Sequence, residues 1–165
     1  MTGLLNRRAL GPLLRRQVGR LRRYGETCAV LMVDVDHSKR INDSFGHAIG
    51  DAAPIALAQL MRQAARDVDH IVRMGGEEFC LLLPHTDLDG ALRLGDRLRE
   101  LVRGADASAC APMTVSVGVA VAQTADEPAD AVIARADAAL YRAKAAGRDR
   151  VVLAEPALLN GLRAA

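Results

Sequence analysis

The chain has 165 residues, 50% of them hydrophobic, which is the usual size and composition of one domain with an ordinary core. Its formal net charge is only +2, from 22 basic and 20 acidic residues, which argues against a dedicated nucleic-acid surface. With two Phe, two Tyr and no Trp, the chain also lacks the rings on which single-stranded bases stack.

The three cysteines, Cys28, Cys80 and Cys110, lie far apart in apolar runs without C-x-x-C spacing. We expect buried free thiols in a reducing compartment rather than a disulfide framework or a metal site. No run approaches the roughly 20 continuous apolar residues of a membrane span, and the N-terminus lacks a signal-peptide pattern. The expected location is therefore the cytoplasm.

The first half of the chain predicts helices around one apolar strand. An amphipathic helix is predicted over residues 6–24, with Asn6 as its N-cap and Gly11-Pro12 as a candidate kink. The apolar run over 28–35 predicts a buried strand that ends at a polar site. Two helical stretches follow, near 38–45 and 51–67. Pro54 is expected in the first turn of the second stretch, where amide groups have no intrahelical partner.

The second half predicts a hairpin followed by helices and strands in alternation. Strands over 70–74 and 77–83 flank Gly75-Gly76, a strong two-residue turn pattern. A helix over 87–103, a strand over 113–121, a helix over 128–146 that Gly147 ends, and a short strand over 151–153 complete the order. The fold class is α/β (α+β), with helices flanking a mainly antiparallel five-stranded sheet around a ferredoxin-like core. We expect one domain over 1–154 and a short tail over 155–165.

Carboxylates gather at three predicted turns or strand ends: Asp34 with Asp36, Asp43 with Asp51, and Glu77 with Glu78. Any one of these clusters is most simply a solvated edge or a helix cap. If the strand ending at Asp34 lies beside the hairpin, however, Asp34 and Glu77 supply the hard oxygen ligands that Mg²⁺ prefers. Gly75 and Gly76 let a nucleotide approach the backbone, and cations for its phosphates are present at Lys39, Lys144 and Arg148. The residues alone therefore predict a metal-dependent phosphate site.

Five strings, in the same order along the chain, resemble the motifs of GGDEF domains: TGLLNRR at 2–8, DVDHSKRINDSFGHAIGD at 34–51, RMGGEEF at 73–79, TVSVGVA at 114–120 and ADAALYRAKAAGRDRV at 136–151. Five ordered motifs are far more specific than a lone GGEEF. The resemblance implies a palm-like fold related to nucleotide cyclases. It also implies a diguanylate cyclase, which joins two GTP molecules into cyclic di-GMP and releases pyrophosphate, with Mg²⁺ or Mn²⁺ as cofactor.

The resemblance assigns roles to individual residues. Asp34 and Glu77, with the carbonyl of Val35, are expected to ligate the metal, and Glu78 is expected to assist at the metal or at the attacking 3′-hydroxyl. The guanine edge is assigned to Asn42 and Asp51, since a carboxylate that accepts from the ring N–H and the exocyclic amine suits guanine and rejects adenine. The glycines Gly75 and Gly76 adjoin the nucleotide, and the phosphates are assigned to Lys39, Lys144 and Arg148.

The product contains two nucleotides while one site holds one GTP, so two protomers are expected to face each other with their hairpins opposed. The family normally relies on a dimerisation or sensor module, and such a module is expected only in a longer protein.

The family's inhibitory R-x-x-D motif is matched by Arg66 and Asp69, and Arg97 falls where a further arginine is common. Forked guanidinium groups recognise guanine and phosphate, so cyclic di-GMP is expected as an inhibitor as well as the product.

The sequence departs from the family pattern at three places. Ser38 stands where the family has phenylalanine, which predicts a cavity or a looser pocket wall. Pro54 stands where a leucine is usual, and an aspartate before the first motif is missing. Three alternatives stay open: a catalytically weak or inactive domain that binds GTP or cyclic di-GMP as a regulatory module, a purely structural α/β interaction module, and a cyclase for another base, which Asp51 disfavours.

Overall fold

The structure is a computed structural model, and it describes residues 4–39, 43, 47–105, 112–124 and 126–156. Its elements, in chain order, are β1 (Leu5–Asn6), α1 (Arg7–Tyr24), β2 (Cys28–Val35), α3 (His47–Ala64), β3 (His70–Gly75), β4 (Glu78–Pro84), α4 (Leu88–Arg103), β5 (Val115–Val121), α5 (Ala129–Ala145) and β6 (Val151–Leu153). None of the helices in these ranges has the length and apolarity that a membrane crossing requires.

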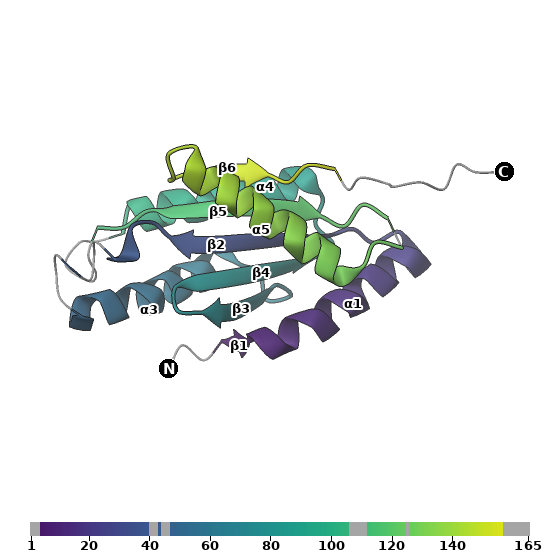
Figure 1. Ribbon diagram of the computed structural model, residues 1–165. Helices are drawn as coiled ribbons and strands as arrows, with labels where there is room; N and C mark the ends of the chain where they lie inside the picture. Colours follow the sequence, from purple (N-terminus) through teal and green to yellow (C-terminus); the bar gives the residue numbers. More distant parts are fainter. Residues whose placement is uncertain (1–3, 40–42, 44–46, 106–111, 125, 157–165) are drawn as a thin grey trace.

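Within the described residues, six strands form one mixed sheet in the order β1-β3-β4-β2-β5-β6. The four inner strands pair antiparallel, whereas β1 and β6 pair in parallel with β3 and β5 at the two edges. Strand β2 lies at the centre and is buried along its whole length, as its sequence, apolar except for Asp34, predicts. Figure 1 shows α1 and α5 crossing one face of this sheet.

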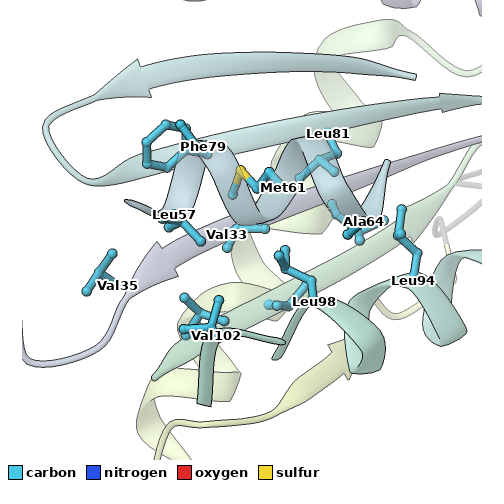
Figure 2. Packing of buried hydrophobic residues seen from close by; sticks show 14 of the residues in the cluster. Val33, Val35, Leu57, Met61, Ala64, Phe79, Leu81, Leu94, Leu98 and Val102 are labelled. Carbon is cyan, nitrogen blue, oxygen red and sulfur yellow. The ribbon is translucent and has the colours of Figure 1, made fainter. Parts of the chain in front are cut away.

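Each face of the sheet has its own core because side chains alternate along β2. Val33 and Val35 point to the face that α3 and α4 cover, where Leu57, Met61 and Leu98 pack against them (Figure 2). On the opposite face, the core contains residues of α1, α5 and the strands, among them Leu10, Leu14, Val30, Met32 and Val132.

Helix α5 packs directly on β5 at Gly118. A Cβ at this position would lie 2.1 Å from the carbonyl oxygen of Ala136 and 2.2 Å from the amide nitrogen of Leu140. Only a residue without a side chain allows this contact of helix backbone with strand. The contact fixes the height of α5 above the sheet.

Most of the predicted elements are present, and the bounds of β2 and β6 agree with the prediction. The predicted five-stranded sheet gains a sixth strand, β1, whose two residues pair with Val72 and Arg73. The hairpin turn is displaced by one residue, to Gly76 and Glu77, because the ladder between β3 and β4 shifts register between Arg73 and Gly75.

The second predicted helix begins earlier than expected, since α3 already includes residues 47–50. Pro54 therefore lies inside the helix, and the prediction that it occupies the first turn is wrong. A glycine inside a helix costs only about 1 kcal/mol relative to alanine, so Gly50 does not stop it. Of the helix predicted over 38–45, only Ser38, Lys39 and Asp43 are among the described residues.

Cys28 and Cys80 are buried free thiols, as predicted, and Cys110 lies outside the described residues. Burial raises the pKa of Cys28 to about 11 and that of Cys80 to about 12. Both thiols are therefore protonated at neutral pH and contribute to the core as small apolar groups.

Candidate active site

Carboxylates from two adjacent strands meet at one end of the sheet. Asp34, near the end of β2, lies directly opposite Glu78, the first residue of β4. Directly opposed residues on neighbouring strands project from the same face, with Cβ atoms about 5 Å apart. This face is the one that α1 and α5 cover, because Met32, two residues before Asp34, packs there.

A pocket of about 300 Å³ opens at this end, and segments far apart in the sequence line it: Asp34, Val35, Asp36, His37, Ser38, Lys39, Glu77, Lys144 and Arg148. The fold thus brings together six of the predicted site residues. Glu78 is exposed and lines a neighbouring groove of about 720 Å³ between α1 and α5. Asn42 and the side chain of Asp51, the two predicted guanine contacts, lie outside the described residues.

The surroundings of Asp34 disfavour its ionised form through burial and nearby negative charge, and favour it through one cation. Its side chain is only 7% exposed, and Lys144 Nζ lies 2.9 Å from its Oδ1. Burial raises the pKa of Asp34, the attraction of Lys144 opposes this, and the charges of Glu77 and Glu78 raise it further. A cation placed beside Asp34 would offset both the cost of burying its charge and the repulsion from the two glutamates.

Ser38 has a role that sequence comparison did not anticipate. Its hydroxyl donates a short hydrogen bond to Oε1 of Glu77. The serine that replaces the family's phenylalanine therefore adds a polar group, and this group holds Glu77 of the hairpin against the pocket wall. The run of residues around Ser38 contains no pattern from which this contact with a turn 39 residues away could have been read.

Asp36 belongs to the framework of the pocket. It is 3% exposed and accepts hydrogen bonds from Thr114 Oγ1 at 2.7 Å, Ser116 Oγ at 2.6 Å and the backbone N–H of Asp149 at 3.0 Å. A carboxylate with three donors is already satisfied. Asp36 therefore ties the end of β2 to β5 and to the loop after α5.

The loop after α5 positions Arg148. Arg148 and Asp149 have φ angles of 64° and 44°, in the left-handed region. The carboxylate of Asp149 pairs with Arg99, 3.3 Å away, and with Arg103, both on α4. These ion pairs and the bond to Asp36 hold the strained loop, so that Arg148 lines the pocket.

The hairpin turn is held by Arg73. Its guanidinium donates to the carbonyl oxygen of Gly76 at 3.0 and 2.6 Å and lies 6.0 Å from the centre of the Phe79 ring. Gly76 has φ 47°, and both Gly75 and Gly76 are exposed. The turn therefore presents bare backbone to solvent, with Glu77 and Glu78 beside it.

Two of the three carboxylates that line the pocket, Asp34 and Glu77, also have the chemistry of a magnesium site. Asp34, Glu77 and the carbonyl of Val35 offer hard oxygens, and Mg²⁺ commonly takes only one or two protein carboxylates together with substrate phosphates. Among the described residues, no three His, Cys, Asp or Glu side chains form a ready-made metal cluster. In this structure Asp34 forms an ion pair with Lys144, and Glu77 accepts a hydrogen bond from Ser38. The residues therefore fit a metal ion that binds together with an anionic substrate, which could take over the contact with Lys144.

The predicted R-x-x-D motif lies at the other end of β4. Arg66 donates to Asp69 Oδ1 at 2.8 Å, to the Pro84 carbonyl at 3.0 Å and to Thr86 Oγ1 at 2.6 Å. Arg97 donates to the carbonyl oxygen of Ala64. The three predicted residues line one pocket of about 370 Å³. Because Glu78 and Pro84 bound β4, this pocket is about 20 Å from the hairpin turn.

Comparison with known proteins places the whole arrangement in one family. The sequence model described as "Diguanylate cyclase, GGDEF domain" matches residues 1–150. The chain is 42% identical over 161 residues to the diguanylate cyclase DgcP of Pseudomonas aeruginosa and 42% identical over 156 residues to DgcM of Escherichia coli. Each match includes 93% of this chain, but the chain spans only 23% of DgcP and 37% of DgcM.

A solved structure agrees with the fold. The GGDEF domain of DgcB from Caulobacter crescentus, crystallised in complex with cyclic di-GMP, superimposes with a TM-score of 0.84 at 31% sequence identity. The superposition includes 93% of this chain and 90% of that one. The two chains therefore share the same overall fold.

Proposed function

The chain belongs to the GGDEF family of diguanylate cyclase domains, and from that premise we propose that it condenses two GTP molecules into cyclic di-GMP and pyrophosphate. The observation that carries the proposal is the meeting of Asp34 and Glu77 with Lys144 and Arg148 in one pocket. Two hard carboxylates facing two cations suit a metal-bound triphosphate.

Asp34, Glu77 and the carbonyl of Val35 would hold Mg²⁺ or Mn²⁺, which supplies neutralisation of the triphosphate charge when bound. Lys144 and Arg148, with Lys39, would contact the phosphates. Lys144 now pairs with Asp34, and a phosphate beside it offers a second anion to the same ammonium group. Asn42 and Asp51 stay our proposed contacts to the guanine edge.

Each half of the reaction forms one phosphodiester bond. The 3′-oxygen of one GTP attacks the α-phosphorus of the other, the bond from that phosphorus to pyrophosphate breaks, and the hydroxyl proton leaves the 3′-oxygen. Glu78, exposed at the start of β4, is the group that we assign to the 3′-hydroxyl, and its carboxylate would accept that proton. Two such steps, one from each protomer of a pair, close the ring.

The second pocket supports product inhibition. Arg97 and Asp69 line it with Arg66, and guanidinium and carboxylate groups together match the edge and phosphates of a guanine nucleotide. Arg66 is already held by Asp69 and Thr86, so it is oriented before any ligand arrives. We assign cyclic di-GMP to this pocket.

The test is turnover. Purified protein is incubated with GTP and Mg²⁺, and the nucleotides are resolved by chromatography. Glu78→Gln should lower cyclic di-GMP formation by about 100-fold or more, because a group at the reacting hydroxyl contributes at least that factor. Glu100→Gln removes an exposed glutamate on α4 outside the site and should leave the rate unchanged.

Two further arms complete the experiment. A chelator should stop turnover, and added cyclic di-GMP should slow the wild type more than Arg97→Ala. If the wild type makes no cyclic di-GMP while GTP still raises its melting temperature, the cyclase proposal fails and a nucleotide-binding regulatory module takes its place.

A further inference from the structure

Helix α1 has an unusual distribution of charge. Its 18 residues include seven arginines and no acidic residue. The chain as a whole is close to balanced, with 22 basic and 20 acidic residues. The excess of positive charge is therefore concentrated on one helix.

Five of these arginines share one side of the helix, which we call the arginine face: Arg8, Arg15, Arg16, Arg22 and Arg23. At 100° per residue they occupy an arc of about 120°, in two rows whose members are seven residues apart. All five are exposed, whereas Leu10, Leu14 and Val18 are buried on the side toward the sheet. The face is about 22 Å long, and Figure 1 shows α1 on the outside of the molecule along this length.

The arginines of the arginine face are not held in ion pairs with any residue that the structure describes. Within the described part of the chain, none of its five members forms an ion pair, although Arg66, Arg99 and Arg135 elsewhere are paired with carboxylates. Glu78, Asp130 and Asp137 line the groove beside α1 together with Arg8 and Arg15 and offset part of their charge without forming ion pairs in the described structure, whereas Arg16, Arg22 and Arg23 do not line this groove. Five like charges on one surface repel one another, so an anionic partner would be bound favourably.

We propose that the arginine face docks on the surface of an anionic phospholipid bilayer. A flat array of phosphates can contact both rows at once, because only Pro12 and Gly19 lie between them. The apolar side of α1 is committed to the core, so the helix adheres through charge and does not insert. Arginine itself can read guanine, but the face has no Asn or Gln to read adenine and no aromatic side chain to stack on bases, so nucleic acid is the less favoured partner.

Co-sedimentation with lipid vesicles tests this proposal without any nucleotide, so its outcome is independent of the cyclase proposal. The full chain should sediment with vesicles of phosphatidylglycerol and phosphatidylcholine, and not with phosphatidylcholine alone. Raising the salt from about 0.1 M to about 1 M shortens the Debye length from about 10 Å to about 3 Å and should release the protein.

Variants locate the contact. Arg16→Gln/Arg23→Gln should weaken vesicle binding by about tenfold or more, since each basic residue near an anionic surface adds to the affinity. Arg93→Gln/Arg150→Gln removes the same charge from exposed positions elsewhere and should leave binding unchanged. Glutamine preserves helix propensity, and circular dichroism verifies the fold of each variant.

Three results would overturn the proposal. The first is equal sedimentation with neutral vesicles, and the second is an equal loss of binding in the two double variants. The third is salt-sensitive binding to duplex DNA without binding to the anionic vesicles, which would assign the face to nucleic acid instead.

Discussion

Asp34 shows how a carboxylate in the candidate site opposes stability. Burial raises its pKa above that of the same residue in the unfolded chain, so the folded protein binds the proton more tightly. It follows that the ionised carboxylate lowers the free energy of unfolding at neutral pH. Stability is regained as the pH falls through the folded pKa.

Asp34→Asn should therefore melt at a higher temperature than the wild type at neutral pH in the presence of a chelator, because asparagine cannot ionise. The difference should shrink as the pH is lowered from about 8 toward about 4.5, where the wild-type carboxyl is increasingly protonated. Cyclic di-GMP formation by the variant should fall by about 100-fold or more, since a charged ligand is lost. Thermal melts of both proteins over this range, with turnover measured beside them, check the prediction.

The ion pair with Lys144 defines the result that would contradict this prediction. If its ion pair with Asp34 outweighs burial, Asp34→Asn will melt below the wild type at neutral pH. Magnesium gives a second comparison. It should raise the melting temperature of the wild type in the presence of GTP and leave that of Asp34→Asn unchanged, because the ligand that we assign to the metal is absent.

The candidate site could be predicted from the sequence only in part. Asp34, Glu77 and Lys144 share one pocket because strand ends and a hairpin turn position them, and such features leave a pattern in the sequence. Asp36 appeared equivalent to Asp34, yet its three donors come from β5 and from the loop after α5. Those contacts join residues 78 to 113 positions apart, and no spacing rule connects them.

At the scale of elements, pattern length decides what can be predicted. Seven of the eight residues of β2 are apolar, and the bounds of this long run follow from the sequence. Strand β1 has two residues, too few for any periodicity, and it exists because Leu5 pairs with Val72. The start of α3 could not be predicted correctly, because Gly50 suggests a break in the helix. The free energy that a glycine costs within a helix is small enough for the neighbouring turns to offset.

The contact of α5 with β5 yields a prediction at this scale. Gly118→Ala would place a Cβ within 2.2 Å of the α5 backbone at Ala136 and Leu140, so the helix that carries Lys144 must move. The free energy of unfolding should fall by about 2 kcal/mol or more, as overpacking commonly does. Urea denaturation measures this loss, and turnover should fall with it.

The matched control is Gly19→Ala on α1, an exposed position where no atom beyond the neighbouring residues and the adjacent helix backbone lies within 4 Å of the new Cβ. Alanine is favoured over glycine in a helix, so this variant should gain about 0.5–1 kcal/mol. Equal effects of the two substitutions would mean that the close packing at Gly118 contributes nothing to stability.

At the scale of the whole molecule, the proposed reaction and the exposed hairpin together predict how two copies would meet. Gly75, Gly76 and Glu78 are exposed, while the residues that we assign to the phosphates lie behind them in the pocket. A nucleotide bound there would present its sugar toward a second copy. We therefore expect the arrangement to be productive only when two protomers approach hairpin to hairpin.

The rate of cyclic di-GMP formation should accordingly depend on protein concentration more steeply than linearly. While most of the protein is monomeric, the number of pairs rises with the square of the concentration, so a logarithmic plot of initial rate should have a slope of about two. The slope should fall toward about one once pairs predominate. Initial rates over a dilution series at saturating GTP and Mg²⁺ measure it. A slope of one at every dilution, for a protein that light scattering shows to be monomeric, would mean that a single copy joins both nucleotides and that opposed hairpins are unnecessary.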